Sequence, residues 1–224
     1  NDITLLGVGG LATGGITTLG GIGSGYLYPA FRGQIAYTTP NMNGLQVTLG
    51  ITNPDQGQDA SGLADYDDRF GLEGKAVYSM GSGKVWAGFS SYDVADSAGD
   101  YDATAGEIGA AFNAGNLGLV AYYYSGEGNG AGLGLNRLGA GLANERDNDG
   151  GYIQATYVIP SGTKLGVAVA TSSQDLAPGE TAGGTAAHDS NDRWTVGAYH
   201  PLTKHLNLVA EYNDIESEDH SGVS

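Results

Sequence analysis

The stretch Gly33–Asn53, GQIAYTTPNMNGLQVTLGITN, decides the fold. It contains two runs in which apolar and polar residues alternate. The apolar residues of the two runs are Ile35 and Tyr37, then Leu45, Val47, Leu49 and Ile51. A period of two predicts strands with one apolar and one polar face. Between the runs, the residues from Asn41 to Gly44 tolerate positive φ, and Pro40 withholds a ladder donor. This pattern predicts an antiparallel hairpin.

The same plan recurs along the chain and predicts ten strands in five hairpins. The strands expected after the first hairpin are Phe70–Met80, Lys84–Val94, Thr104–Phe112, Leu117–Ser125, Tyr152–Ile159, Lys164–Gln174, Arg193–His200 and His205–Ile215. Turns within hairpins are short, whereas connections between hairpins are long and polar. Two strands leave their orientation open: Trp86 and Phe89 fall on opposite faces of one, and both faces of Leu117–Ser125 are apolar.

Composition restricts the class of protein. A formal charge of −16 argues against nucleic-acid binding, because few basic residues are present to neutralise phosphates. Forty glycines occur without a Gly-X-Y period, which excludes collagen, and cysteine is absent, which excludes disulfides and thiolate metal sites. No apolar run reaches the roughly 20 residues of a membrane helix. A membrane β-barrel stays open, because its signal is weak alternation in segments of about 10 residues.

Charge is distributed unequally between the two kinds of connection. The short turns hold no acidic residue, and Lys84, Lys164 and Lys204 lie at or beside them. The long connections, such as Pro54–Arg69 and Gly126–Gly150, are rich in acidic residues. An outer-membrane barrel has this form, with short turns at one end and long loops at the other. We therefore predict an all-β, antiparallel up-and-down transmembrane β-barrel.

Three regions are expected along the chain. Residues 1–31 are Gly-rich and nearly uncharged, and their apolar content favours packing over a free linker. Residues 32–217 hold the barrel strands, and residues 218–224 begin a loop. The sequence opens at Asn1 with neither Met nor a signal peptide, so we expect a processed or partial chain.

The segment from Tyr37 to Gly44, followed by an alternating strand, resembles the Gram-negative general porins. The resemblance implies a barrel of sixteen strands, a trimer, and a third outside loop that folds into the barrel and narrows it. On this comparison residues 1–31 resemble the constricting loop, and the ten strands resemble the sixth to the fifteenth. Strands one to five and the last strand are missing. An open sheet in lipid would leave unpaired edges, so we expect the rest of the barrel from further sequence or from other chains. Family loops usually carry several acidic residues, whereas Asp2 is the only one here.

Candidate functional residues are the polar ones on the water-facing side of the strands. In a barrel these side chains line the lumen and set the potential that a passing ion meets. The pore-lining candidates are Arg32, Gln34, Gln46, Glu73, Lys75, Glu107, Gln154, Arg193 and Glu211. The common phosphate-loop, nucleophile-elbow and zinc-protease motifs do not occur, so an enzyme is not expected. The acidic loop residues Asp65, Asp67 and Asp68 are a weak candidate for Ca²⁺, and no other cofactor is expected.

These features predict a passive diffusion channel for small hydrophilic solutes and ions, with modest cation preference. The expected place is the bacterial outer membrane, and the expected partners are lipid, lipopolysaccharide and two further copies in a homotrimer. Two alternatives stay open. A soluble β-sandwich that serves as a binding or adhesion module would bury the apolar strand faces between two sheets. A structural surface barrel would share the fold but conduct nothing.

Overall fold

The computed structural model describes residues 8–11, 14–17, 23–27, 33–53, 56–58, 64–66, 69–94, 101–129, 140–141, 144–181 and 188–221. Ten strands form one antiparallel sheet in the order β16-β15-β14-β13-β10-β9-β8-β7-β4-β3. Each strand pairs with its neighbours along the chain, which gives up-and-down connectivity. The strands are β3 Gln34–Thr38, β4 Leu45–Thr52, β7 Gly71–Met80, β8 Gly83–Val94, β9 Tyr101–Ala114, β10 Leu117–Glu127, β13 Asp147–Val158, β14 Lys164–Gln174, β15 His188–Thr203 and β16 Leu206–Asp219.

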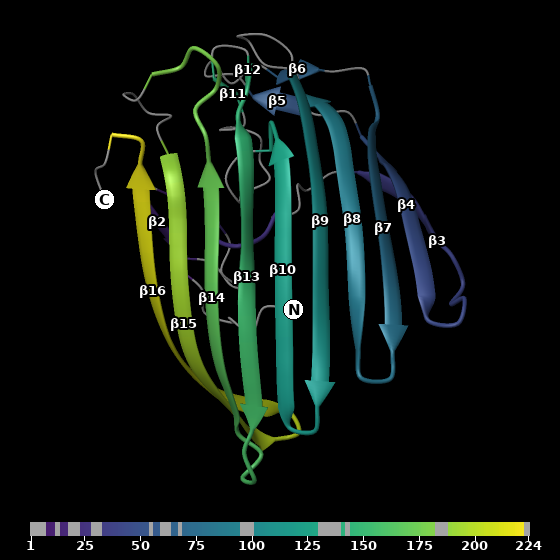
Figure 1. The fold of residues 1–224 in the computed structure, drawn as a ribbon, viewed down its shortest axis with the longest axis vertical. Coiled ribbons are helices and arrows are strands. Elements are labelled where there is room, and N and C mark those ends of the chain that lie inside the picture. The colour runs from purple at the N-terminus through teal and green to yellow at the C-terminus, as the bar shows by residue number, and fades with distance from the viewer. Residues whose placement is uncertain are drawn as a thin grey trace.

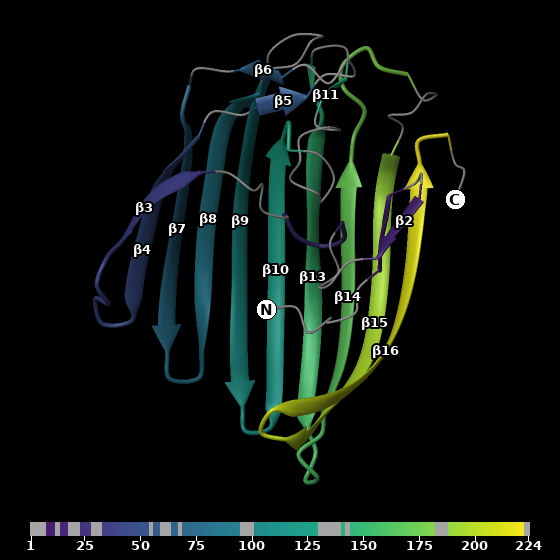
Figure 2. The ribbon, with the colours of Figure 1, turned by 180° about the vertical axis from the view of Figure 1, so that it is seen from behind.

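The sheet curves strongly, so that one face is convex and the other concave (Figures 1 and 2). β3 and β16 form its two edges. Three small two-stranded sheets accompany it: β1 Val8–Leu11 with β2 Gly14–Thr17, β5 Gln56–Gln58 with β6 Ala64–Tyr66, and β11 Ala140–Gly141 with β12 Asn144–Glu145. The β1–β2 pair lies on the concave side, where β1 contacts β16 (Figure 2). The part of the chain that the structure describes contains no helix that could cross a membrane.

Short and long connections lie at opposite ends of the strands, as the sequence predicts (Figure 1). The first short turn needs residues that tolerate positive φ, and Asn43 and Gly44 adopt φ values of 55° and 99° there. At Gly44 a Cβ atom would lie 2.4 Å from the carbonyl oxygen of Ser79, so this position requires glycine for space as well as for conformation. The turns at Gly115 and Gly162 also have positive φ, but open space surrounds them.

The apolar strand faces lie on the convex side of the sheet and are exposed. Leu49, Val167 and Leu208 have exposures of 58%, 46% and 53%. They belong to the apolar strand faces that a membrane barrel would turn toward lipid, and no second sheet covers them within the described ranges. The all-β, up-and-down prediction is confirmed. A sandwich would have buried these side chains, so the single exposed face is the arrangement that lipid requires.

Several strands extend further toward the long connections than the sequence predicted. β13 begins at Asp147 instead of Tyr152, and β16 continues to Asp219 instead of ending at Ile215. The boundaries were misplaced because polar residues near the strand ends were interpreted as loop. Acidic residues can continue the ladder there, because the strand ends extend beyond the apolar part of the convex face into water.

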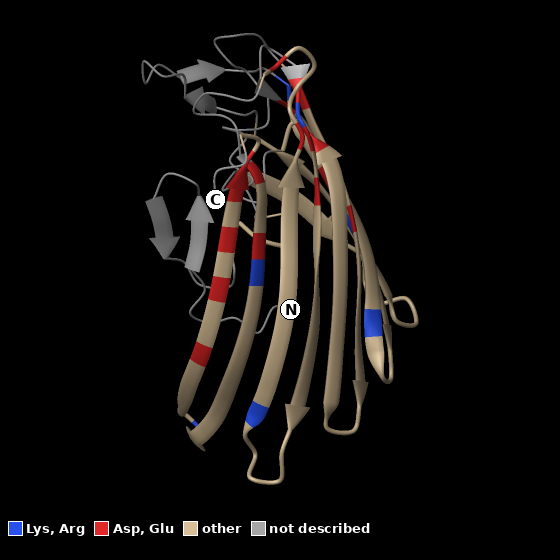
Figure 3. Ribbon diagram, turned by 60° about the vertical axis from the view of Figure 1, so that its left-hand side comes forward, with Lys and Arg blue, Asp and Glu red and all other residues tan. Residues whose placement is uncertain are grey.

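This extension also corrects the expected position of the acidic residues. Several acidic residues that were expected in the long connections, or beyond the last predicted strand, belong instead to strand ends. At those positions their side chains alternate onto the convex face. These residues are Asp102, Glu127, Asp147, Asp149, Asp192, Glu216 and Glu218. Asp93 and Asp214, which lie in strands that the sequence predicted, point to the same side. Figure 3 shows acidic residues along β16 and near the long connections, and basic residues at several places that include the strand ends near short turns. These carboxylates therefore face away from the concave side.

The structure settles the two strands whose orientation was open. In β8, Trp86 is on the concave face with 7% exposure, and Phe89 is on the convex face with 52% exposure. In β10, Tyr122 and Tyr124 are on the concave face and are buried, whereas Tyr123 is on the convex face. Something other than water must cover these concave aromatic side chains.

Candidate functional site

An aromatic cluster covers the middle of the concave face. Trp86, Tyr122, Tyr124 and Tyr152 are all buried and come from β8, β10 and β13. The rings of Trp86 and Tyr122 stack at 6.5 Å between centroids, and those of Tyr122 and Tyr152 at 5.5 Å. Trp86 can lie flat because its cross-strand partner is Gly109, where a Cβ atom would lie 2.1 Å from the indole ring. The cluster forms a platform of buried aromatic side chains on an otherwise polar wall.

The segment Gly23–Leu27 lies against this platform; we call it the docked segment. Three wall residues bind it through hydrogen bonds. Asn191 donates from Nδ2 to the Gly23 carbonyl oxygen at 2.9 Å, and Arg193 donates from Nε to Ser24 Oγ at 3.0 Å. The Gly25 amide donates to Ser172 Oγ at 2.8 Å.

Aromatic and aliphatic contacts extend the attachment of the docked segment. Tyr26 meets Tyr152 edge-on at 6.4 Å between ring centroids. Leu27 packs against the aromatic cluster beside it. Side chains therefore hold the docked segment on both sides of Gly25. Polar side chains of β15 bind the residues before Gly25, and the aromatic cluster packs against the residues after it.

Gly25 brings the docked segment into direct contact with the wall. Its φ is +87°, and a Cβ atom there would lie 2.7 Å from Ala170 Cβ and 3.0 Å from the Gly151 carbonyl oxygen. Both the backbone conformation and the available space therefore require glycine. Because Ala170 and Gly151 have little or no side chain, the segment lies flush against β13 and β14.

A charged group lies beside the aromatic platform. Lys75 on β7 donates from Nζ to Glu107 Oε1 on β9 at 2.7 Å, and Tyr122 donates its hydroxyl to Glu107 Oε2 at 2.7 Å. β8 lies between the two charged residues, and the intervening position is Gly88, which pairs with both. A larger residue there would separate them, since a Cβ atom at Gly88 would lie 3.0 Å from Glu107.

A second pair of side chains on the concave face also meets across a glycine of the intervening strand. Gln34 donates from Nε2 to Glu73 Oε2 at 2.6 Å across β4, where Gly50 leaves room for the amide. Together the two pairs border a hollow of about 410 Å³ whose wall also includes Leu27 of the docked segment. The charged groups that line this hollow are Glu73, Lys75 and Glu107: two carboxylates and one ammonium, a formal net charge of −1.

The other predicted pore-lining residues are spread over the concave face. Gln46 is exposed, Gln154 is buried, and Glu211 on β16 accepts a hydrogen bond from the Tyr199 hydroxyl. Arg193 was expected to face the lumen, but it is only 3% exposed because the docked segment covers it. Arg32, Asp67 and Asp68, and the side chain of Asp65, lie outside the described residues. Where side chains are described, no three acidic or histidine groups gather as metal ligands.

Sequence reasoning missed the residues that bind the docked segment. Ser172 and Asn191 are small polar residues in strands, and nothing in their spacing marks them as partners of a segment that lies 147 and 168 residues away from them. The only available signal was the apolar inner face of Leu117–Ser125, because a water-filled lumen does not require Tyr122 and Tyr124 there.

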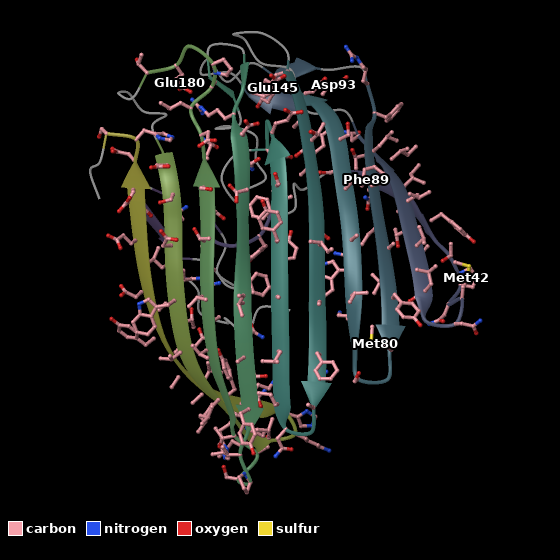
Figure 4. The ribbon with its side chains drawn as sticks, viewed as in Figure 1. Met42, Met80, Phe89, Asp93, Glu145 and Glu180 are labelled. Atoms are coloured by element: carbon pink, nitrogen blue, oxygen red, sulfur yellow. The ribbon has the colours of Figure 1, made fainter. Side chains whose placement is uncertain are left out.

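An ion pair joins two connections at the long-connection end, which we call the loop clamp. Arg146, just before β13, donates from Nε to Glu180 Oε2 at 2.8 Å and from Nη2 to Glu180 Oε1 at 2.5 Å. The Ala177 amide also donates to Glu180 Oε2, at 3.0 Å. The arginine side chain is 2% exposed and the glutamate side chain 13%. Glu180 lies among the long connections (Figure 4), so the clamp fixes the connection after β14 to the segment before β13.

The loop clamp should open in acid. The hydrogen bonds from Arg146 lower the pKa of the Glu180 carboxyl below its ordinary value. A carboxyl with a lowered folded pKa stabilises the closed form fully above its ordinary pKa of 4.5, and that contribution is lost as pH falls through the lowered value. Glu180→Gln should weaken the clamp by about 1 kcal/mol at neutral pH, because neutral hydrogen bonds are weaker than charged ones. In Glu180→Gln, the amides of residues 175–181 should exchange about fivefold faster than in the unaltered protein at neutral pH. The protection of these amides in the variant should also no longer change between about pH 3 and pH 5, once the intrinsic exchange rate is accounted for. Unchanged protection in Glu180→Gln would contradict the clamp.

Comparisons with known proteins agree with this geometry. Residues 2–220 match the model of the family described as Gram-negative porin. The fold is similar to the outer membrane channel DcaP of Acinetobacter baumannii, with a TM-score of 0.72 and 16% identity over 85% of this chain. It is also similar to a porin refined at 1.8 Å resolution, with a TM-score of 0.61 and 19% identity over 83% of this chain. The chain spans 57% and 56% of the lengths of these two structures. Comparison with curated protein sequences gives no match.

Proposed function

Because this chain belongs to the Gram-negative porin family and its place is the bacterial outer membrane, we propose that it forms the wall of a passive diffusion channel for small hydrophilic solutes and ions. One observation carries the proposal: a single curved sheet is apolar on its convex face and polar and charged on its concave face. A lipid-facing exterior and a water-filled interior require this distribution.

The docked segment acts in this proposal as the constriction. It crosses the concave face over β13, β14 and β15, where it reduces the space available to a solute. It also covers Arg193, which is 3% exposed. The hollow beside the segment carries a net charge of −1, while the ammonium of Lys84 lies over the Trp86 ring, 5.6 Å from its centroid. This balance supports a modest preference for cations. We further propose a homotrimer surrounded by lipid and lipopolysaccharide, with acidic outer loops as weak Ca²⁺ sites.

Planar-bilayer recordings test the channel and its selectivity together. In a KCl gradient the reversal potential should show a modest cation preference that fades near 1 M salt, where the Debye length is about 3 Å. Glu73→Gln should reduce the preference, because it removes the net charge of the hollow. Glu216→Gln is the matched control: it removes the same charge from the convex face and should leave the reversal potential unchanged.

Two results would decide against parts of the proposal. Absence of conductance would favour a structural barrel. Anion preference would mean that basic residues outside the described ranges dominate the narrow part of the pore.

A further inference from the structure

The Lys75–Glu107 pair has the chemistry of a cation-binding site that the chain fills with its own side chain. The Lys75 ammonium lies 2.7 Å from a Glu107 carboxylate oxygen and 5.9 Å from the centroid of the Trp86 ring. A carboxylate beside the face of a tryptophan is a favourable environment for an organic cation. We propose that this is a subsite for permeating organic monocations with N–H donors, namely primary ammonium and guanidinium groups, and that such a cation binds by displacing Lys75.

The receiving groups are held in place independently of Lys75. Glu107 also accepts a hydrogen bond from the Tyr122 hydroxyl, so its carboxylate stays oriented when the lysine leaves. Trp86 is fixed by its close contact with Gly109 and by stacking on Tyr122. Neither group has to rearrange to receive a second cation.

Lys75 itself can be displaced. Its side chain is 49% exposed, and an ion pair of this exposure is stabilised only weakly, because water screens the charges and the lysine loses side-chain entropy. The carboxylate of Glu107 is 21% exposed, so a cation can reach it from the concave side. A solute cation can therefore displace the tethered ammonium once its concentration approaches the effective concentration of the lysine, on the order of mM.

The hollow beside the pair fits an organic cation better than a metal ion. Its volume of about 410 Å³ lies within the usual 300–1,000 Å³ of small-molecule sites. Leu27 and Tyr92 add apolar wall, and Glu73 adds a second carboxylate. Guanidinium suits this lining because it stacks on aromatic rings and donates two parallel hydrogen bonds to one carboxylate. A metal ion would need more oxygen ligands than these two carboxylates provide.

Binding of methylguanidinium chloride tests the subsite without relying on conduction. The sequence has two tryptophans, so Trp194→Phe leaves Trp86 as the only indole reporter. In the protein folded in detergent, methylguanidinium should change the fluorescence emission of Trp86, and this change should saturate as the methylguanidinium concentration rises. Adding Lys75→Met should lower the half-saturating concentration about fivefold, because the ammonium that pairs with Glu107 is gone. Lys84, whose Nζ lies 5.6 Å from the centroid of the Trp86 ring, is left in place in both proteins. Adding Glu107→Gln to the Trp194→Phe, Lys75→Met protein should raise the half-saturating concentration at least about tenfold.

Controls and a parallel conductance measurement separate this proposal from the channel function on which its role in permeation rests. Lys164→Met, which removes a lysine near the short turns, should leave the titration unchanged. Equal curves for all variants, or the same emission change with KCl, would overturn the subsite. If KCl currents are normal in that case, the channel proposal stands and only the subsite fails. If the titrations follow the expected order but no current flows, the subsite stands and the channel proposal fails.

Discussion

Gly25→Val is expected to release the docked segment from the wall and to raise single-channel conductance. The valine would take a positive φ, which costs about 1–2 kcal/mol. Its side chain would also overlap Ala170 and the Gly151 carbonyl, and overpacking of this kind costs about 1–3 kcal/mol. A total of roughly 2 kcal/mol or more shifts the equilibrium between docked and released forms at least about 30-fold.

The matched control for this variant is Gly162→Val. Gly162 has a φ of +82° and open space around it, so the substitution adds the backbone strain without a clash at the wall. Its conductance should equal that of the unaltered protein. If Gly25→Val conducts like the unaltered protein while folding normally, the docked segment does not narrow the pore.

Val167→Arg should cost about 2–4 kcal/mol of folding free energy in lipid vesicles. Val167 lies in the middle of β14 on the convex face, between Leu165 and Val169, and all three are exposed. An arginine there must place its charge near the middle of the hydrocarbon. Denaturant titration in vesicles measures the change.

Thr171→Arg controls for the new charge alone. Thr171 is on the same strand and the same face but pairs with Asp192 near the long connections. The cost there should be about 0–1 kcal/mol, because the penalty falls steeply toward the interface. Equal costs at both positions would mean that the convex face does not meet lipid.

The sequence was sufficient for the strands and their order because alternation and turn chemistry are local signals. Asn43 and Gly44 adopt the positive φ that their residue types favour, and the hairpin follows from that turn. Strand ends were less certain, because Asp147 and Asp149 are polar whether they belong to a loop or to a wet strand end.

The site was only partly predictable. Glu73, Lys75 and Glu107 were identified because they are charged residues on the polar faces of alternating strands, and the structure brings all three to one hollow. Their pairing depends on register: Lys75 meets Glu107 only because Gly88 lies between them. The burial of Arg193 could not be foreseen, because it depends on Ser24, which lies in a Gly-rich segment without periodicity.

The outward carboxylates of β16 have a consequence for the membrane itself. On that strand the convex face is apolar from Leu206 to Tyr212 and acidic from Asp214 onward. The six residue steps from Leu206 to Tyr212 span roughly 20 Å along the strand. Because barrel strands are tilted, the apolar band is shorter still when measured along the membrane normal. An average bilayer has a hydrocarbon thickness of about 30 Å, and the bacterial outer membrane is thinner. The apolar height of β16 therefore matches a thin bilayer, and a thicker bilayer would have to thin locally around this strand.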